Sequence, residues 1–241
     1  MNSETQSEPP LSAPEAPVYS VPWKFIDNWI GVGLLVIVEA AIALIMTRST
    51  ADIIQSAAVL LLESAYLLPV ILILAWRGIH WKHLGFGKFE WSTLGIGCGL
   101  LIASYVIILM HNLLLLAFGV DTQGDQIMKL FAELDSPFWF FLVGAVFAPL
   151  VEEIFFRGFL FQGFRQKYGW IGAMLLSSAI FAAAHLDLVA FIPTFILGCL
   201  LAYMYHRSNS VWPGIILHFL VNSLSLCAAY FVTQYAHLIP S

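Results

Sequence analysis

Charged residues are scarce in this sequence. Asp, Glu, Lys and Arg make up 10% of the 241 residues, whereas soluble proteins carry about 25% on average. Hydrophobic residues account for 60%, and the mean hydropathy is +0.87. No cluster of Lys or Arg is present, which excludes a nucleic-acid partner. We therefore expect an integral, polytopic membrane protein.

Cysteine is also rare, and common protease signatures are missing. Cys98, Cys199 and Cys227 lie in apolar runs without CxxC spacing, so neither a disulfide framework nor a thiolate metal site is indicated. HExxH, GxSxG and GxGD do not occur, so the common zinc, serine and aspartyl signatures give no support. Any proteolytic chemistry must come from another set of residues.

The amino-terminal segment lacks the basic start and apolar centre of a signal peptide. Residues 1–22 instead contain five prolines and three glutamates. This composition predicts a disordered, Pro-rich acidic tail. Residues 23–241 are expected to form one transmembrane helical domain.

Long hydrophobic runs are abundant. A helix needs about 20 residues to cross a bilayer, and seven runs come near or exceed that length. They cover residues 26–46, 57–76, 94–118, 138–164, 171–185, 188–206 and 211–232. The predicted fold is an all-α polytopic transmembrane bundle of about seven spans, whose short fifth run forms a helical hairpin or a partly re-entrant pair with the sixth.

Basic residues are unevenly divided between the loops. Seven of them fall on the side of the amino terminus and two on the other side: Lys24, Arg77, Lys82, Lys88, Arg165, Lys167 and Arg207, against Arg48 and Lys129. The excess of positive charge predicts a cytoplasmic amino terminus. The acidic linker 119–137 is then external, as a candidate amphipathic surface segment.

Three charged residues, Glu152, Glu153 and Arg157, lie inside the apolar run 138–164. A charge near the bilayer centre costs about 2.5–3.5 kcal/mol, so such residues usually face a bundle interior or a watery cavity. Glu153 and Arg157 are four residues apart and share one helix face. We predict that they form an ion pair and leave Glu152 free for chemistry. The alternative is a charge cluster that only sets helix packing.

Other polar residues also fall within predicted spans. Glu39 and Glu63 stand alone in the first and second runs, where they either have structural roles or line a cavity. His111 and Asn112 in the third run are expected to form interhelical hydrogen bonds.

Two further pairs stand near the carboxyl end. His185 follows Phe181 by four residues, and His218 and Asn222 share one helix face. Counting about 1.5 Å per residue places these groups and Glu152 roughly 9–22 Å deep. Helix tilt can absorb part of that spread, so a polar pocket near mid-membrane is expected.

Such a pocket suits hydrolysis of a peptide bond. The Glu152 carboxylate can take a proton from water, and His185 can orient that water or relay the proton. His218 and Asn222 offer donors for an oxyanion. Alternatively, two histidines and a carboxylate could hold Zn²⁺ with an open water position. The residues alone leave both possibilities open.

Three ordered motifs resemble those of the CPBP intramembrane proteases, which include type II CAAX prenyl endopeptidases and bacteriocin-processing or immunity proteins. The motifs are EExxxR at 152–157, FxxxH at 181–185 and HxxxN at 218–222. The flanking FFRGFL and VWPG are also similar, and the resemblance covers about residues 138–225.

The resemblance implies an all-helical bundle with an intramembrane cavity. In that cavity Glu152 and His185 activate water, His218 and Asn222 stabilise the oxyanion, and Glu153 pairs with Arg157. It implies a glutamate-type mechanism without a metal, with zinc as the alternative, and a membrane-associated protein or peptide substrate. Some members of the family bind partners without cleaving them, so a membrane scaffold or immunity-type protein is the alternative function.

Overall fold

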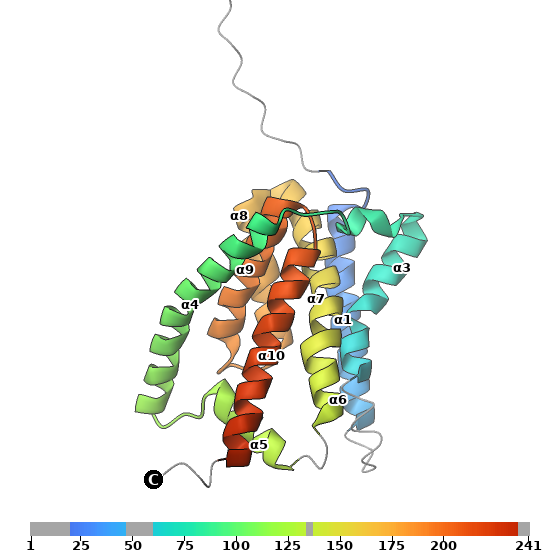
Figure 1. The fold of residues 1–241 in the computed structure, drawn as a ribbon. Helices are drawn as coiled ribbons and strands as arrows, with labels where there is room; N and C mark the ends of the chain where they lie inside the picture. The colour runs from blue at the N-terminus through green and yellow to red at the C-terminus, as the bar shows by residue number, and fades with distance from the viewer. Residues whose placement is uncertain (1–19, 47–59, 134–136, 236–241) are drawn as a thin grey trace, which may run out of the picture.

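The computed structural model describes residues 20–46, 60–133 and 137–235 (Figure 1). Every regular element in these ranges is a helix, which confirms the all-α class. Most of the predicted disordered tail, and Arg48, lie outside the described residues.

The helices follow one another along the bundle. Those that precede the acidic linker are α1 (Phe25–Met46), the helical segment 60–65, α3 (Leu67–Arg77), the short η1 (Trp81–Leu84) and α4 (Trp91–Ala117). Those that follow are α5 (Gln123–Glu133), α6 (Phe138–Phe141), η2 (Leu142–Phe147), α7 (Ala148–Glu153), η3 (Ile154–Phe161), α8 (Gln162–Ala184), α9 (Phe191–Ser208) and α10 (Trp212–Tyr235).

Five of the described helical stretches are long and apolar enough to cross a membrane. They are Phe25–Ile45, Leu60–Arg77, Trp91–Ala117, Phe138–Ala184 and Trp212–Tyr235. The fourth stretch contains two of the predicted runs, 138–164 and 171–185. The chain bends between them at Gly169, where φ is 67° and ψ is 179°. The remaining run, α9, is not among the five. It packs against α8, α4 and α10.

The core lies around η3, which is buried along its whole length. A helix that carries a charge inside the membrane, as η3 does with Arg157, usually faces the bundle interior. Here the enclosing rings include Trp23 against Phe159 and Tyr66 against both Phe155 and Phe156. By contrast, only 6% of the most apolar stretch of α4 is buried. This helix therefore presents most of its apolar surface to the surrounding lipid.

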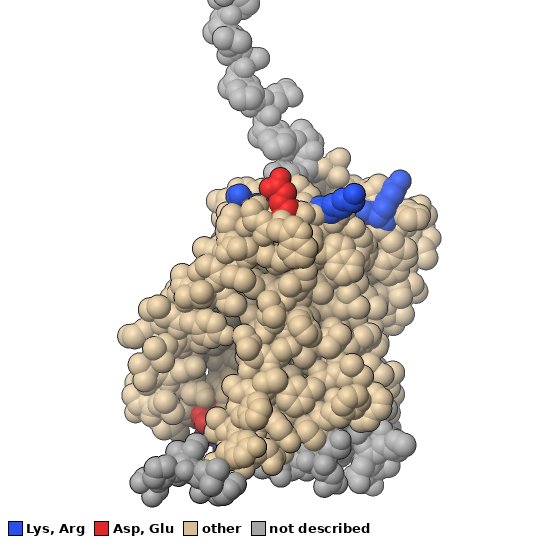
Figure 2. All heavy atoms as spheres, viewed as in Figure 1, with Lys and Arg blue, Asp and Glu red and all other residues tan. Residues whose placement is uncertain are grey.

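The two ends of the bundle differ in charge. We name as the basic face the end formed by the start of α1, the loop 78–90, the bend at Gly169 and the loop 209–211 (Figure 1). Figure 2 shows Lys and Arg side chains at this end. The opposite end, which we name the α5 face, is formed by α5 and the end of α10, and the loop 185–190 lies partway along the bundle in the half nearer to it (Figure 1).

The predicted amphipathic linker segment forms α5 on the face opposite the basic one. Its first turn is stabilised by reciprocal hydrogen bonds, from the Thr122 backbone N–H to Asp125 Oδ2 (2.8 Å) and from the Asp125 N–H to Thr122 Oγ1 (3.3 Å), as in a capping box. The bonds from Thr122 hold the pKa of the Asp125 carboxyl below its usual value. Phe131 on α5 packs against Tyr230 of α10. This contact attaches α5 to the bundle.

Candidate active site

Glu152 and Glu153 lie on α7, a short α-helical piece between two π-helices, η2 and η3. π-helical turns are uncommon and occur frequently at functional sites. In η2 the backbone bonds run from each N–H to the carbonyl five residues earlier, as from Ala148 to Val143. The next donor in that series would be residue 149, which is proline and has no N–H. The Gly144 carbonyl consequently loses its helical partner.

Asn222 supplies the missing donor. Its Nδ2 donates to the Gly144 carbonyl oxygen over 2.8 Å, so the side chain ties α10 to the helix at the point where Pro149 interrupts its hydrogen bonding. An amide nitrogen carries two hydrogens, and the second remains for a ligand. Asn222 was predicted only as an oxyanion donor, and the structure adds this positioning contact.

The predicted ion pair between Glu153 and Arg157 is confirmed. Arg157 Nη1 donates to Glu153 Oε1 over 2.6 Å, and the side chains of Arg157 and Glu153 are 1% and 0% exposed. Arg157 also donates to the Gly198 carbonyl over 3.1 Å, and its guanidinium lies 4.4 Å from the centroid of the Phe181 ring. Gly214 of α10 makes room for the pair, because a Cβ there would lie 2.5 Å from Glu153 Oε2.

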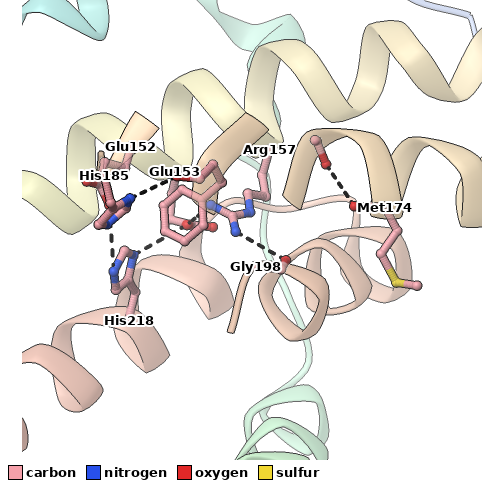
Figure 3. Close-up of polar contacts among 9 residues, drawn as sticks. Glu152, Glu153, Arg157, Met174, His185, Gly198 and His218 are labelled. Atoms are coloured by element: carbon pink, nitrogen blue, oxygen red, sulfur yellow. Dashed lines mark hydrogen bonds and ion pairs between the residues drawn. The ribbon is translucent and has the colours of Figure 1, made fainter. Parts of the chain in front are cut away.

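His218 lies between the two carboxylates of α7. Its Nε2 is 3.6 Å from Glu152 Oε2, and its Nδ1 is 3.5 Å from Glu153 Oε1. The residue is 2% exposed. From the sequence we expected Glu152 to have no partner on its own helix, and the structure brings a partner from α10. In Figure 3 both histidines and Glu152 lie together, and Arg157 extends from Glu153 toward Gly198.

His185 is oriented by its own helix. One ring nitrogen, Nδ1, is 2.8 Å from the Phe181 carbonyl oxygen. Because a carbonyl only accepts hydrogen bonds, Nδ1 must carry the hydrogen, and in the neutral ring Nε2 is then an acceptor. The Phe181 ring packs edge-on against both His185 and His218, with centroids 4.8 Å and 5.8 Å away. Phe181 therefore positions both imidazoles.

A cavity of about 320 Å³ joins the predicted residues. Glu152, His185, His218 and Asn222 all line it. The other lining residues are Glu63, Leu101, Ser104, Tyr105, Ile108, Gln123, Ile127, Phe140, Gly144, Ala148, Phe181, Pro193, Thr194, Leu197, Val221, Ser225 and Leu226. Four side chains predicted from three separate motifs thus line one cavity.

Several residues that line the cavity were given no definite role from the sequence. Glu63 lines the cavity, and its Oε2 is buried without a hydrogen-bond partner among the described residues. Its position alone in an apolar run was the available signal. Phe181 was noted only as part of a motif. His111 makes a hydrogen bond, although not between two helices as predicted: its Nε2 lies 3.0 Å from the Val189 carbonyl oxygen and links α4 to the loop 185–190.

A zinc ion would need three or more protein ligands around one point. Within the described ranges, no three His, Cys, Asp and Glu side chains converge closely enough to hold one metal ion. In particular, Nε2 of His185 does not combine with His218 and Glu152 into a set of three ligands around one ion. These side chains as placed do not fit a zinc site.

Comparison with known proteins addresses the carboxyl-terminal half of the chain. Residues 134–224 match the family of "Type II CAAX prenyl endopeptidase Rce1-like" proteins. The resemblance inferred from the three motifs is confirmed at family level. The matched stretch, which we call the Rce1-like segment, contains all three motifs and spans α6 to most of α10.

Three curated relatives share parts of the chain. They are "Putative membrane peptidase YdiL" of Bacillus subtilis (26% identity over 106 residues), "Uncharacterized 24.3 kDa protein" of Escherichia coli (33% over 106) and "UPF0177 protein YaiF" of Lactococcus lactis (28% over 148). The alignments cover 44%, 41% and 57% of this chain, and 43%, 48% and 64% of the relatives, about half their length. No solved structure matches the chain.

The contact between Asn222 and Gly144 gives a testable prediction. Asn222→Ala is expected to lower the free energy of unfolding by about 1–3 kcal/mol, because it leaves the Gly144 carbonyl without a donor. In a Pro149→Ala background the restored N–H of residue 149 can take over that carbonyl, so the same Asn222 substitution should cost much less. Thermal unfolding of the four proteins in detergent measures this double-mutant cycle. Equal costs in both backgrounds would refute the assignment.

Proposed function

We propose that this protein is an intramembrane endopeptidase of the CAAX prenyl protease type, which hydrolyses a peptide bond in a membrane-associated protein or peptide. One observation carries the proposal. Glu152 and His185 line the same cavity. Glu152 Oε2 is buried there without a hydrogen bond among the described residues, and Nε2 of His185 is left as a hydrogen-bond acceptor. The similarity of the Rce1-like segment to a family of endopeptidases supports the same conclusion.

In the proposed reaction a water molecule binds between Glu152 and His185. Its oxygen attacks the peptide carbonyl carbon while Glu152 takes its proton, and His185 orients the water through Nε2. The developing oxyanion accepts hydrogen bonds from His218 and from the second N–H of Asn222. The proton then passes from Glu152 to the leaving nitrogen, the C–N bond breaks, and an amine and a carboxylic acid are released; the acid then gives up its proton to solvent.

Arg157 and Glu153 support this chemistry without touching the substrate. By neutralising each other they leave Glu152 as the carboxylate that faces the cavity, and Arg157 holds α9 through the Gly198 carbonyl. We further propose that the basic face, with the amino terminus, is cytoplasmic.

Peptide mapping tests the proposed activity. Membrane proteins from cells that produce the native protein, Glu152→Gln, or the control Glu90→Gln are compared for new termini; Glu90 is an exposed carboxylate at the start of α4. A cleavage product present with the native protein and the control, and absent with Glu152→Gln, is the expected result. If no product differs and the Glu152→Gln variant still retains the same bound partners, the chain is a scaffold and the proposal fails.

A further inference from the structure

The described residues leave the cavity unequally accessible from the two ends of the bundle. Resting on the proposed peptidase function, we infer that the substrate reaches the site from the α5 face and not from the basic face. If the basic face is cytoplasmic, the substrate class is a membrane-anchored polypeptide whose cleaved segment lies in the extracytoplasmic half of the bilayer.

The residues that line the cavity are displaced toward the α5 face. Gln123 and Ile127 come from α5 itself, His185 follows the last residue of α8, and Pro193 stands in the first turn of α9. None of the described lining residues belongs to the basic-face loops 78–90 and 209–211 or to the bend at Gly169. The space therefore extends from Glu152 and His218 toward α5.

Exposure changes in the same direction. Glu152 and His218 are 4% and 2% exposed, at the inner end of the cavity. His185 is an exposed residue, and the loop directly after it carries Leu186 and Leu188, which are 88% and 91% exposed. The catalytic group nearest the α5 face is thus the one that a substrate can reach first.

The basic face is closed over the site by the loop 78–90. Gln162 Nε2 donates to the His83 carbonyl (2.8 Å), the Val211 N–H donates to the Gly85 carbonyl (2.9 Å), and Ser210 Oγ donates to the Gly87 carbonyl (2.7 Å).

Close packing completes the seal. Leu84 is fully buried, and a Cβ on Gly158 would lie 2.8 Å from its carbonyl oxygen, so the loop rests directly on η3. Below this contact lies the buried pair of Glu153 and Arg157. A polypeptide approaching from the basic face would have to displace all of these contacts.

A side opening accompanies the opening toward α5. Toward the α5 face α4 diverges from α10 (Figure 1), and Figure 2 shows a hollow between these helices. Ser104 and Tyr105 of α4, and Ser225 of α10, line the cavity, so it can be reached from that half of the bilayer. The prenylated carboxyl terminus of a cytoplasmic protein would instead arrive on the closed side.

Cysteine labelling tests the direction of access. In a protein with Cys98, Cys199 and Cys227 replaced by alanine, one cysteine is placed in the cavity by Ser225→Cys, and Ser104→Cys is a second cavity variant. Lys88→Cys marks the basic face, and Lys129→Cys marks the α5 face. A small, charged, membrane-impermeant methanethiosulfonate is added to intact cells or to inverted membrane vesicles, and the labelled fraction is measured over time.

We expect the cavity cysteines and Lys129→Cys to react at least about tenfold faster in intact cells, and Lys88→Cys to react faster in inverted vesicles. Cavity cysteines that react from the side of Lys88→Cys, or from neither side, would overturn the access route. Reaction of Lys88→Cys in intact cells would overturn the extracytoplasmic substrate class. Labelling does not depend on catalytic turnover and is repeated with Glu152→Gln. A protein without peptidase activity would therefore still report the access route, and the two proposals can fail separately.

Discussion

Glu152→Gln and His185→Ala are each expected to slow turnover by about 10²–10⁴-fold, the usual contribution of a general acid–base group. The double variant should be little slower than either single variant, because two groups that act on the same water do not contribute additively. His218→Ala and Asn222→Ala should each cost on the order of 10²–10³-fold if they donate to the oxyanion. Rates are measured on the product found by peptide mapping.

The same variants separate the two possible mechanisms. With a zinc ion, His185 and His218 would be equivalent ligands, and either substitution would release the metal. Elemental analysis of the active protein after exhaustive chelation is therefore decisive. Full activity without metal is the expected result. One zinc per chain whose removal stops cleavage and whose return restores it would refute the mechanism based on Glu152 as the general base.

Arg157→Leu is expected to destabilise the protein by about 3–5 kcal/mol, because removing one partner of a buried ion pair leaves an uncompensated charge. That charge is Glu153, which is fully buried. Glu152→Gln should cost much less, since Glu152 Oε2 makes no hydrogen bond among the described residues and its contact with His218 Nε2 is long, at 3.6 Å. Thermal unfolding in detergent compares the two.

A matched control removes both charges. Glu153→Leu combined with Arg157→Leu should be more stable than Arg157→Leu alone, because apolar replacement of a whole buried pair is often tolerated. Equal stability of Arg157→Leu and Glu152→Gln would show that the contact between Arg157 and Glu153 contributes little. A double variant less stable than Arg157→Leu would contradict the explanation by an unpaired charge.

Much of this architecture could be predicted from local patterns. The hydrophobic runs determine the all-α class, and the four-residue spacing of Glu153 and Arg157 is enough to predict their pair, which the structure contains. Both depend on one helix at a time. The reach of Asn222 to Gly144 depends instead on the absent N–H of Pro149 and on which carbonyl a π-helix exposes, which spacing for an ideal α-helix does not reveal.

The placement of His218 was harder to predict. Depths counted from an ideal helix rise separate His218 from His185, yet both line one cavity, and the helices that carry them are not parallel (Figure 1). The contribution of α5 was also missed. Its residues Gln123 and Ile127 reach the cavity, although nothing in the linker's composition indicates which part of the bundle it covers.

The composition of α9 has a consequence for how the protein is made. This helix is not among the stretches of the described residues that are long and apolar enough to count as spans. In η3, before α8, the charge of Arg157 is balanced by its contact with Glu153. Segments of this kind are poor substrates for insertion one at a time. Because α9 packs against both α8 and α10, we expect the translocation machinery to release these three helices into the lipid together.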